Sequence, residues 1–249
     1  MDLDLWARHL ADSHVALVTY AFSNRSARLP VKDITRIARD AGAVSIVDAV
    51  QTTGVIPYQA NDLGADFILG TCVKYLCGGQ GAGYLWADPE VAARCEPVDT
   101  GWFSHENPFE FDIHSYRLAE GAMRFWGGTP SIAPFVVAKC GIDEIAAAGV
   151  QNNYLHNQGL IDRIHAGLPE GAAASEVERD HRGNAVMIRV MDIDAALSDL
   201  KRAGVSADNR EGNVRVSPHI YNTEAEIDLL LEVVAPHVMQ RLRPLAANG

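Results

Sequence analysis

The chain has 249 residues, of which 48% are hydrophobic and 21% are charged, proportions that are ordinary for a soluble globular protein with one or two domains. Its formal net charge of −11 disfavours nucleic acid and anionic membranes as partners, because no basic surplus is present to neutralise phosphates. No apolar run reaches membrane-spanning length, and residues 1–4 lack the pattern of a signal peptide, so we expect a cytoplasmic protein.

The four cysteines do not predict a metal site or a disulfide scaffold. Cys72 and Cys77 are close in sequence but lack a second pair of ligands, so zinc is not expected there. Cys95 and Cys140 stand alone. We therefore expect buried free thiols.

Strands and helices alternate in the first part of the chain, which is typical of a parallel sheet with crossover helices. The loop between the first strand and the next helix is polar and lies at a strand's carboxyl end, where open α/β sheets bind ligands. In chain order we expect a helix over 3–10, a buried strand over 14–20, a polar loop over 23–30, a helix over 31–41 and a strand over 43–51.

Two candidate catalytic residues follow neighbouring strands. The strand over 43–51 contains Asp48, and the apolar run 65–69 leads to Lys74. A lysine in this place is either a desolvated nucleophile that forms a Schiff base with an aldehyde or a lysine whose stem packs on the sheet while its amine reaches water. Asp48 favours the first alternative, because pyridoxal phosphate enzymes need a lysine for the aldehyde and an aspartate that keeps the pyridine nitrogen protonated.

Glycines are concentrated in residues 78–83, G-G-Q-G-A-G. A dinucleotide-binding loop is disfavoured, because this cluster leads into an expected strand over 84–86 rather than a helix and no acidic residue follows at the required distance. We expect a strained turn that lets the segment containing Lys74 fold over a ligand.

An irregular segment over 100–112 carries Trp102, Phe103 and His105. Loops seldom expose a Trp-Phe pair without using it, so this pair either contacts a ligand or fills a subunit or domain interface. His105 is either an acid-base group or a satisfied core histidine. Thr129 precedes a long apolar helix over 131–148, where a hydroxyl and free amides bind an anion or simply cap the helix.

The C-terminal part predicts a small α+β domain. The break at Leu168–Gly171 suggests a boundary, with a partial large domain over 1–168 and a small domain over 169–249. Arg215 lies between two valines in a short strand and either forms a fixed fork for a carboxylate or takes part in a surface ion pair. Expected elements are a helix over 151–167, a strand over 184–190, a helix over 193–203, a strand over 214–216 and a helix over 223–242.

The chain resembles the class V aminotransferase group of fold-type I pyridoxal phosphate enzymes, which includes kynureninases and cysteine desulfurases. The segments that carry the resemblance are V-D-A-V-Q-T-T-G (47–54), G-A-D-F (64–67) with a lysine shortly after, and G-G-x-G-x-G (78–83). The resemblance implies an α/β fold of the PLP-dependent transferase-like type, with a mixed, mostly parallel sheet, helices on both faces and a small C-terminal α+β domain. It also implies a homodimer with shared active sites.

The resemblance assigns cofactor contacts to five residues. Lys74 and Asp48 are the catalytic pair, and Gln51 matches the glutamine that bonds the phenolic oxygen in cysteine desulfurases, where kynureninases usually have a histidine. Thr129 matches a residue that reaches the phosphate in the partner subunit's site. Ser26 lies at about the position of a small polar residue that touches cofactor or substrate, although a solvated turn explains it equally well.

Four further residues match the family's phosphate and substrate contacts. Trp102 corresponds to a tryptophan that meets the phosphate in the kynureninase G-W-F-G-H segment, in which Phe103 and His105 line the substrate pocket. Arg215, in V-R-V-S-P-H, matches the arginine that binds the substrate carboxylate.

The resemblance covers nearly the whole chain but only part of a typical family protein, because no counterpart of the N-terminal phosphate loop and pyridine-stacking ring is present. We expect a PLP-dependent enzyme that acts on an amino acid, kynureninase-like or aminotransferase-like. The alternatives are one subunit of a split enzyme, completed by a separate N-terminal polypeptide, and a truncated non-catalytic homologue. Retention of Asp48, Lys74 and Arg215 favours the enzyme. Cysteine desulfuration is disfavoured, because no cysteine lies in a loop shortly before Arg215.

Overall fold

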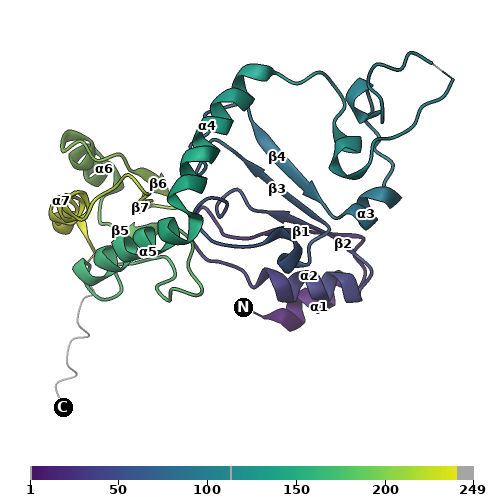
Figure 1. The fold of residues 1–249 in the computed structure, drawn as a ribbon. Coiled ribbons are helices and arrows are strands. Elements are labelled where there is room, and N and C mark those ends of the chain that lie inside the picture. Colours follow the sequence, from purple (N-terminus) through teal and green to yellow (C-terminus); the bar gives the residue numbers. More distant parts are fainter. Residues whose placement is uncertain (1, 113, 240–249) are drawn as a thin grey trace. The chain divides into compact units, whose positions relative to one another are not determined.

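The computed structural model describes residues 2–112 and 114–239, and the chain divides into two compact units (Figure 1). Unit 1 comprises Met1–Tyr20, Pro30–Thr53 and Tyr58–Ala147, and unit 2 comprises Ala21–Leu29, Gly54–Pro57 and Ala148–Gly249. Within the described residues, no helix is both long enough and apolar enough to cross a bilayer.

Unit 1 is built on a four-stranded sheet in the order β1-β2-β3-β4 (Figure 1). The first three strands are parallel and β4 is antiparallel to β3, which confirms the expected mixed, mostly parallel sheet. Its elements are α1 (Leu3–Leu10), β1 (Val15–Thr19), α2 (Val31–Asp40), β2 (Val44–Asp48), η1 (Ala60–Leu63), β3 (Phe67–Thr71), β4 (Gly83–Ala87), α3 (Pro89–Arg94), η2 (Trp102–Ser104), η3 (Gly121–Phe125) and α4 (Ile132–Ala148).

Helix α2 forms because its apolar residues recur at helical spacing. Val31, Ile34 and Ala38 lie on one face and are buried as the helix packs against β1 and β2. The helix starts after Pro30, and Gly42 follows its end with a positive φ of 75° that a residue with a side chain adopts only under strain. The expected strand–helix–strand unit that delivers Asp48 is confirmed.

Unit 2 contains a three-stranded antiparallel sheet in the order β5-β7-β6 with helices packed on it, the small α+β arrangement that was expected. The elements are α5 (Val150–Gly167), β5 (Val186–Arg189), α6 (Ile193–Arg202), β6 (Asp208–Arg210), β7 (Asn213–Val216), α7 (Glu224–Val234) and η4 (Ala235–His237). Strand β6 was not expected from the sequence, since its residues are polar.

The division of the chain falls after Ala147 rather than at the expected 168/169. The reason is α5, whose residues Leu160, Ile161 and Ile164 are buried in one apolar cluster with the sheet of unit 2. The break at 168–171 marks the end of this helix, but the helix itself packs with the strands that come after it in the chain.

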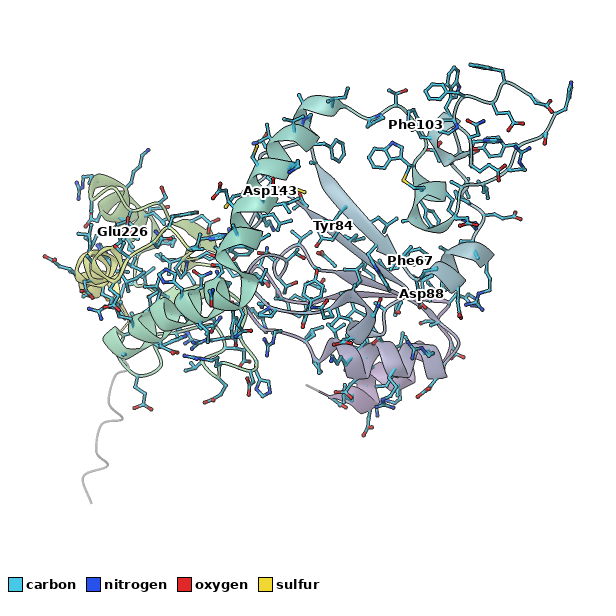
Figure 2. The ribbon with its side chains drawn as sticks, viewed as in Figure 1. Phe67, Tyr84, Asp88, Phe103, Asp143 and Glu226 are labelled. Atoms are coloured by element: carbon cyan, nitrogen blue, oxygen red, sulfur yellow. The ribbon has the colours of Figure 1, made fainter. Side chains whose placement is uncertain are left out.

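Helix α7 ends at Val234, earlier than the expected residue 242. Pro236 follows within a short 3₁₀ turn and cannot donate the backbone hydrogen bond that continued helix would need. Residues 240–242 of the expectation lie outside the described residues. At the start of the helix the Thr223 N–H donates to Glu226, which is labelled in Figure 2, and this bond lowers the pKa of the Glu226 carboxyl group.

Candidate active site

Asp48 is the last residue of β2, at the carboxyl end of the parallel strands. Its Cα is paired with Thr19 of β1 and Leu69 of β3. The side chain is half-buried, and Oδ1 accepts a hydrogen bond of 2.9 Å from the N–H of Val50. The backbone carbonyl accepts one from the N–H of Tyr20, also at 2.9 Å. The Val50 N–H therefore orients the carboxylate, while the Tyr20 N–H fixes the backbone of Asp48 at the carboxyl end of the strand.

Lys74 lies in the turn that follows β3, the parallel neighbour of β2, so the expected placement of lysine and aspartate after adjacent strands is confirmed. The turn closes through hydrogen bonds from the Gly78 N–H to Cys72 O at 2.7 Å and from the Cys77 N–H to Lys74 O at 2.9 Å. The expected burial of the Lys74 side chain is wrong for this chain, because the turn carries it beyond the sheet and leaves it exposed.

Helix α4 packs backbone to backbone against this turn. A Cβ added at Gly78 would lie 2.9 Å from the Cα of Ala138, and one at Gly141 would lie 2.5 Å from the carbonyl oxygen of Cys77. Only glycine allows such an approach on both sides. The glycine cluster after Lys74 is thus a compact turn that enters β4, as expected, and α4 fixes its position.

A hydroxyl cluster that sequence reasoning missed lies beside the ends of these strands. Thr53 Oγ1 is 2.6 Å from Tyr58 Oη and also hydrogen-bonds Oη of Tyr84, the residue labelled in Figure 2. Burial raises the pKa of Tyr84, which keeps the phenol neutral. The ring lies so close to Gly70 that a Cβ there would overlap it. The signal for this cluster was the pairing of Gly70 with Tyr84 in the β3–β4 hairpin. That pairing can be recognised only once the register of the two strands is known.

Trp102 and Thr129 are carried by segments that lie side by side in unit 1. A Cβ at Gly101 would overlap the carbonyl oxygen of Gly127, so the two backbones touch. Trp102 is 60% exposed, with its ring edge-on to Phe111 at 5.8 Å between centroids. Phe103, labelled in Figure 2, is half-buried and Thr129 is exposed. The structure therefore brings together the backbone segments that carry the two residues to which the resemblance gives phosphate contacts.

His105 is a packed histidine rather than an open acid-base group. It is 6% exposed, and Nδ1 lies 2.8 Å from the carbonyl oxygen of Asn107 and 2.9 Å from its nitrogen. Its Nε2 lies 3.4 Å from the carbonyl oxygen of Ser115, and the ring packs edge-on against Tyr116 at 5.0 Å. Of the two alternatives left open by the sequence, the structure favours the satisfied core histidine.

Ser26 belongs to unit 2 and is 2% exposed, so the solvated turn considered for it is wrong. Its Oγ accepts a hydrogen bond of 3.0 Å from the N–H of Ala185, and its backbone oxygen accepts another from Gly183. It also holds a positive φ of 53°. The hydroxyl ties residues 21–29 to the strand region of unit 2, which accounts for a small polar residue here without a ligand.

Arg215 projects from β7 while its neighbours Val214 and Val216 are buried, as expected. Its Nε and Nη2 donate to the two carboxylate oxygens of Asp208 at 2.8 and 2.6 Å, and Nη1 donates to Ser23 O at 3.1 Å. A guanidinium has five N–H groups, of which these bonds use three. One N–H on each terminal nitrogen remains for a carboxylate, so the ion pair and a ligand-binding role are compatible.

The structure assigns the expected residues to three places. Asp48, Gln51 and Lys74 follow adjacent strands in unit 1, where Gln51 is half-buried in the turn after β2. Trp102, Phe103 and Thr129 form a second group in unit 1, while Ser26 and Arg215 are in unit 2.

The chain matches the family described as Aminotransferase class-V over residues 1–230. It belongs to the class V aminotransferase family. The family consists of pyridoxal phosphate-dependent enzymes, and pyridoxal phosphate is the cofactor that membership implies for this chain.

Named relatives within the family differ in activity. The chain is 25% identical to an uncharacterized aminotransferase, YcbU, from Bacillus subtilis, over 97% of this chain and 64% of YcbU. It is 26% identical to a kynureninase from Pseudomonas fluorescens, over 82% of this chain and 50% of that protein. A solved cysteine desulfurase from Thermococcus onnurineus superposes with a TM-score of 0.82 at 23% identity, over 95% of this chain and 62% of that one. The chain thus spans only about half to two thirds of these proteins.

The residues present fit pyridoxal phosphate in part. An exposed lysine after β3 is accessible to an aldehyde, and a half-buried carboxylate after β2 suits a protonated pyridine nitrogen. The exposed ring of Trp102 and hydroxyl of Thr129 are both accessible to a phosphate. Buried Ser26 and packed His105 offer no comparable contact.

Proposed function

We propose that this chain carries the catalytic lysine and aspartate of a pyridoxal phosphate-dependent enzyme that acts on an amino acid, with kynureninase-like or aminotransferase-like activity. The observation that carries the proposal is the placement of Asp48 and Lys74 after adjacent parallel strands at their carboxyl ends. This is the position at which open α/β sheets present reacting groups.

The protein's part in the reaction is to bind, orient and move protons. When bound, the cofactor supplies an electron sink for the bonds to the substrate's α-carbon. In our proposal the Lys74 amine would hold the cofactor at its aldehyde, and it would serve as the general base for the substrate's α-proton. The Asp48 carboxylate holds a proton at the ring nitrogen, and the Gln51 amide donates to the phenolic oxygen.

The remaining assignments concern phosphate and substrate. In this proposal Trp102 binds the phosphate of its own site and Thr129 reaches the phosphate in the partner subunit's site. Phe103 lines the substrate pocket. Arg215 binds the substrate carboxylate with the two N–H groups that Asp208 and Ser23 leave available. Asp208 then acts as a positioning residue, because it fixes the plane of the guanidinium.

We also propose that the active protein is a homodimer with shared sites and that a further N-terminal polypeptide segment completes the cofactor site. The further segment is supported by the fact that this chain covers only part of the length of its relatives. The exposure of Lys74 supports it as well, since a catalytic amine gains reactivity when its surroundings exclude water.

The proposal disfavours cysteine desulfuration. Within the sequence no cysteine lies between Cys140 and Arg215, and Cys140 is fixed in α4, where it cannot serve as a persulfide carrier on a loop. The alternative is that the chain is not an enzyme but a non-catalytic homologue with a dimerisation or regulatory role. The partial coverage of its relatives favours this alternative as well.

The test is the visible absorbance of the purified chain with added pyridoxal phosphate, before and after borohydride reduction. We expect a Schiff-base absorbance band, and we expect borohydride to convert the Schiff base into a stable reduced adduct. The band should be lost in Lys74→Ala and kept in Lys139→Ala. Lys139 is the matched control because it is an exposed lysine of the same unit, and its hydrogen bond to Asp143 raises its pKa and so disfavours the reactive neutral amine. A folded chain that gives no band, alone or with an added N-terminal segment, would favour the non-catalytic homologue.

A further inference from the structure

The small sheet of unit 2 has one apolar face and one charged face. Cross-strand partners lie on the same face of a sheet, so the register of β5, β7 and β6 assigns each residue to a face. The first face lies in the apolar core, with Val186 and Ile188 from β5 and Val214 and Val216 from β7. The second face, which we call the arginine face, carries the polar residues Arg189, Asp208, Arg210, Asn213 and Arg215.

The arginine face has a surplus of positive charge. It carries three guanidinium groups against the single carboxylate of Asp208, whereas the whole chain has a formal net charge of −11. Arg189 donates to the backbone carbonyl oxygens of Gly171 and Ala173, which satisfy its N–H groups without cancelling its charge. The face therefore suits a ligand with two negative charges.

Arg210 and Arg215 converge on one oxygen of Asp208. Oδ2 of this carboxylate lies 2.6 Å from Nη2 of Arg215 and 3.0 Å from Nη2 of Arg210. Because both nitrogens approach the same atom, they lie within about 6 Å of each other. Nη1 of Arg210 also donates to the carbonyl oxygen of Asn209 at 3.0 Å. Asp208 thus holds two guanidinium groups side by side.

Arg210 keeps N–H groups for a ligand. A guanidinium has five of them, and the contacts with Asp208 and Asn209 use two. The Arg210 side chain is 39% exposed and that of Arg215 is 21% exposed, so solvent reaches both and the outer guanidinium belongs to Arg210. The turn after β6 adds no net charge, because Glu211 is paired with Arg25 at 3.9 Å.

From these observations we propose that Arg210 binds a second carboxylate of the substrate, so that the enzyme acts on an amino acid with an acidic side chain. The inference rests on the proposed function, in which Arg215 binds the α-carboxylate. With both carboxylates bound, the three guanidinium groups of the arginine face are balanced by three negative charges, one of them on Asp208. Two-pronged pairing with a guanidinium also orients the second carboxylate. Arg210 is then a specificity-determining residue, and Asp208 sets the spacing of the two anion sites.

The test is an NMR titration of the full chain with L-glutamate and L-aspartate, each compared with its amide, L-glutamine or L-asparagine, at constant ionic strength. The amides match the acids in size but have neutral side chains, so the comparison isolates the second negative charge. The signals to follow are the side-chain Nε–H groups of Arg210 and Arg215. At least one acid should bind about three- to tenfold more tightly than its amide. The acidic chain as a whole repels anions, so its overall field does not produce this preference.

Three variants make the test specific. Arg210→Gln should reduce the preference for the acid to about onefold and leave binding of the amide little changed. Arg210→Lys keeps the charge but loses the two-pronged fork, so it should retain part of the preference. Arg202→Gln is the matched control and should keep all of it, because Arg202 is an arginine of α6 in the same unit that is also paired with an aspartate, Asp199.

Two results would overturn this inference alone. The first is equal binding of each acid and its amide by a chain in which Arg215→Gln weakens both, since the α-carboxylate role of Arg215 would then stand without a second site. The second is a preference for the acid that persists unchanged in Arg210→Gln. No shift of the Arg215 signal with any of the four amino acids would overturn the inference together with the α-carboxylate role in the proposed function. The titration uses no cofactor, so it is independent of Lys74 chemistry.

Discussion

Asp208 should stabilise unit 2 through its pair with Arg215, and a double-mutant cycle measures the effect. Asp208→Ala removes charge-assisted hydrogen bonds of 2.8 and 2.6 Å to Arg215 and an ion pair of 3.0 Å with Arg210. Exposed ion pairs contribute about 0.2–1 kcal/mol, and hydrogen bonds to charged groups contribute up to about 3 kcal/mol. Because the Arg215 side chain is 21% exposed and that of Asp208 42%, we expect a coupling free energy of about 1–2 kcal/mol.

The assay is urea unfolding of the parent chain, Asp208→Ala, Arg215→Ala and the double variant. The pair of Arg163 and Asp228 is the matched control, since it is also two-pronged, at 2.6 and 2.7 Å, but its side chains are 40% and 54% exposed. The control coupling should be smaller and should fall further in about 1 M salt. A coupling below about 0.3 kcal/mol for Asp208 and Arg215 would refute the view that Asp208 holds the guanidinium in place.

Three further predictions concern stability. Gly101→Ala should cost about 1–3 kcal/mol, measured as a fall in Tm, because its Cβ would overlap a carbonyl oxygen, while Gly128→Ala, with nothing near its Cβ, should cost less than half as much. Burial opposes a charge on Asp162, but hydrogen bonds from Arg182 and Arg179 outweigh it and lower the pKa of this carboxyl group below 3.8. Asp162→Asn should therefore destabilise the chain at neutral pH, and the difference in unfolding free energy between the two chains should shrink as the pH falls below about 4. A difference that stays constant with pH would contradict this. Ser26→Ala should cost about 1–3 kcal/mol in urea unfolding by leaving a buried N–H unpaired, and an unchanged midpoint would remove the structural role of the hydroxyl.

The parts of the fold that sequence predicted best are those set by local periodicity. Val31, Ile34 and Ala38 recur at helical spacing, and the helix they predict is α2 within one residue. The apolar runs that end in Asp48 and lead to Lys74 form adjacent parallel strands, because each is a short β-branched or apolar segment bounded by polar or glycine residues.

Long-range placement could not be predicted in the same way. The run 14–20 contains mostly apolar residues and so predicts burial on both faces of the strand, yet Val15 and Leu17 are 55% and 65% exposed. The burial expected for Lys74 was also wrong. The exposure of a side chain in a turn depends on the groups that surround the turn, and the residue types of the turn do not determine it.

Side-chain roles were hardest to predict where a local and a distant partner compete. Ser26 has a polar neighbourhood in sequence, but its partner Ala185 lies 159 residues further along the chain. His105 bonds to backbone groups within ten residues and so is satisfied locally, which its residue type does not reveal. Tyr84 acquires its buried hydroxyl contacts only through strand pairing.

The most direct test of the central claim is to locate the reduced adduct. The sequence has four lysines, Lys32, Lys74, Lys139 and Lys201, so proteolysis and mass spectrometry after borohydride reduction with pyridoxal phosphate give an unambiguous assignment. With a completing segment present, we expect the pyridoxyl group on Lys74 in large excess over the other three. Equal labelling of all four, or a preference for another lysine, would contradict the assignment of Lys74 as the catalytic residue.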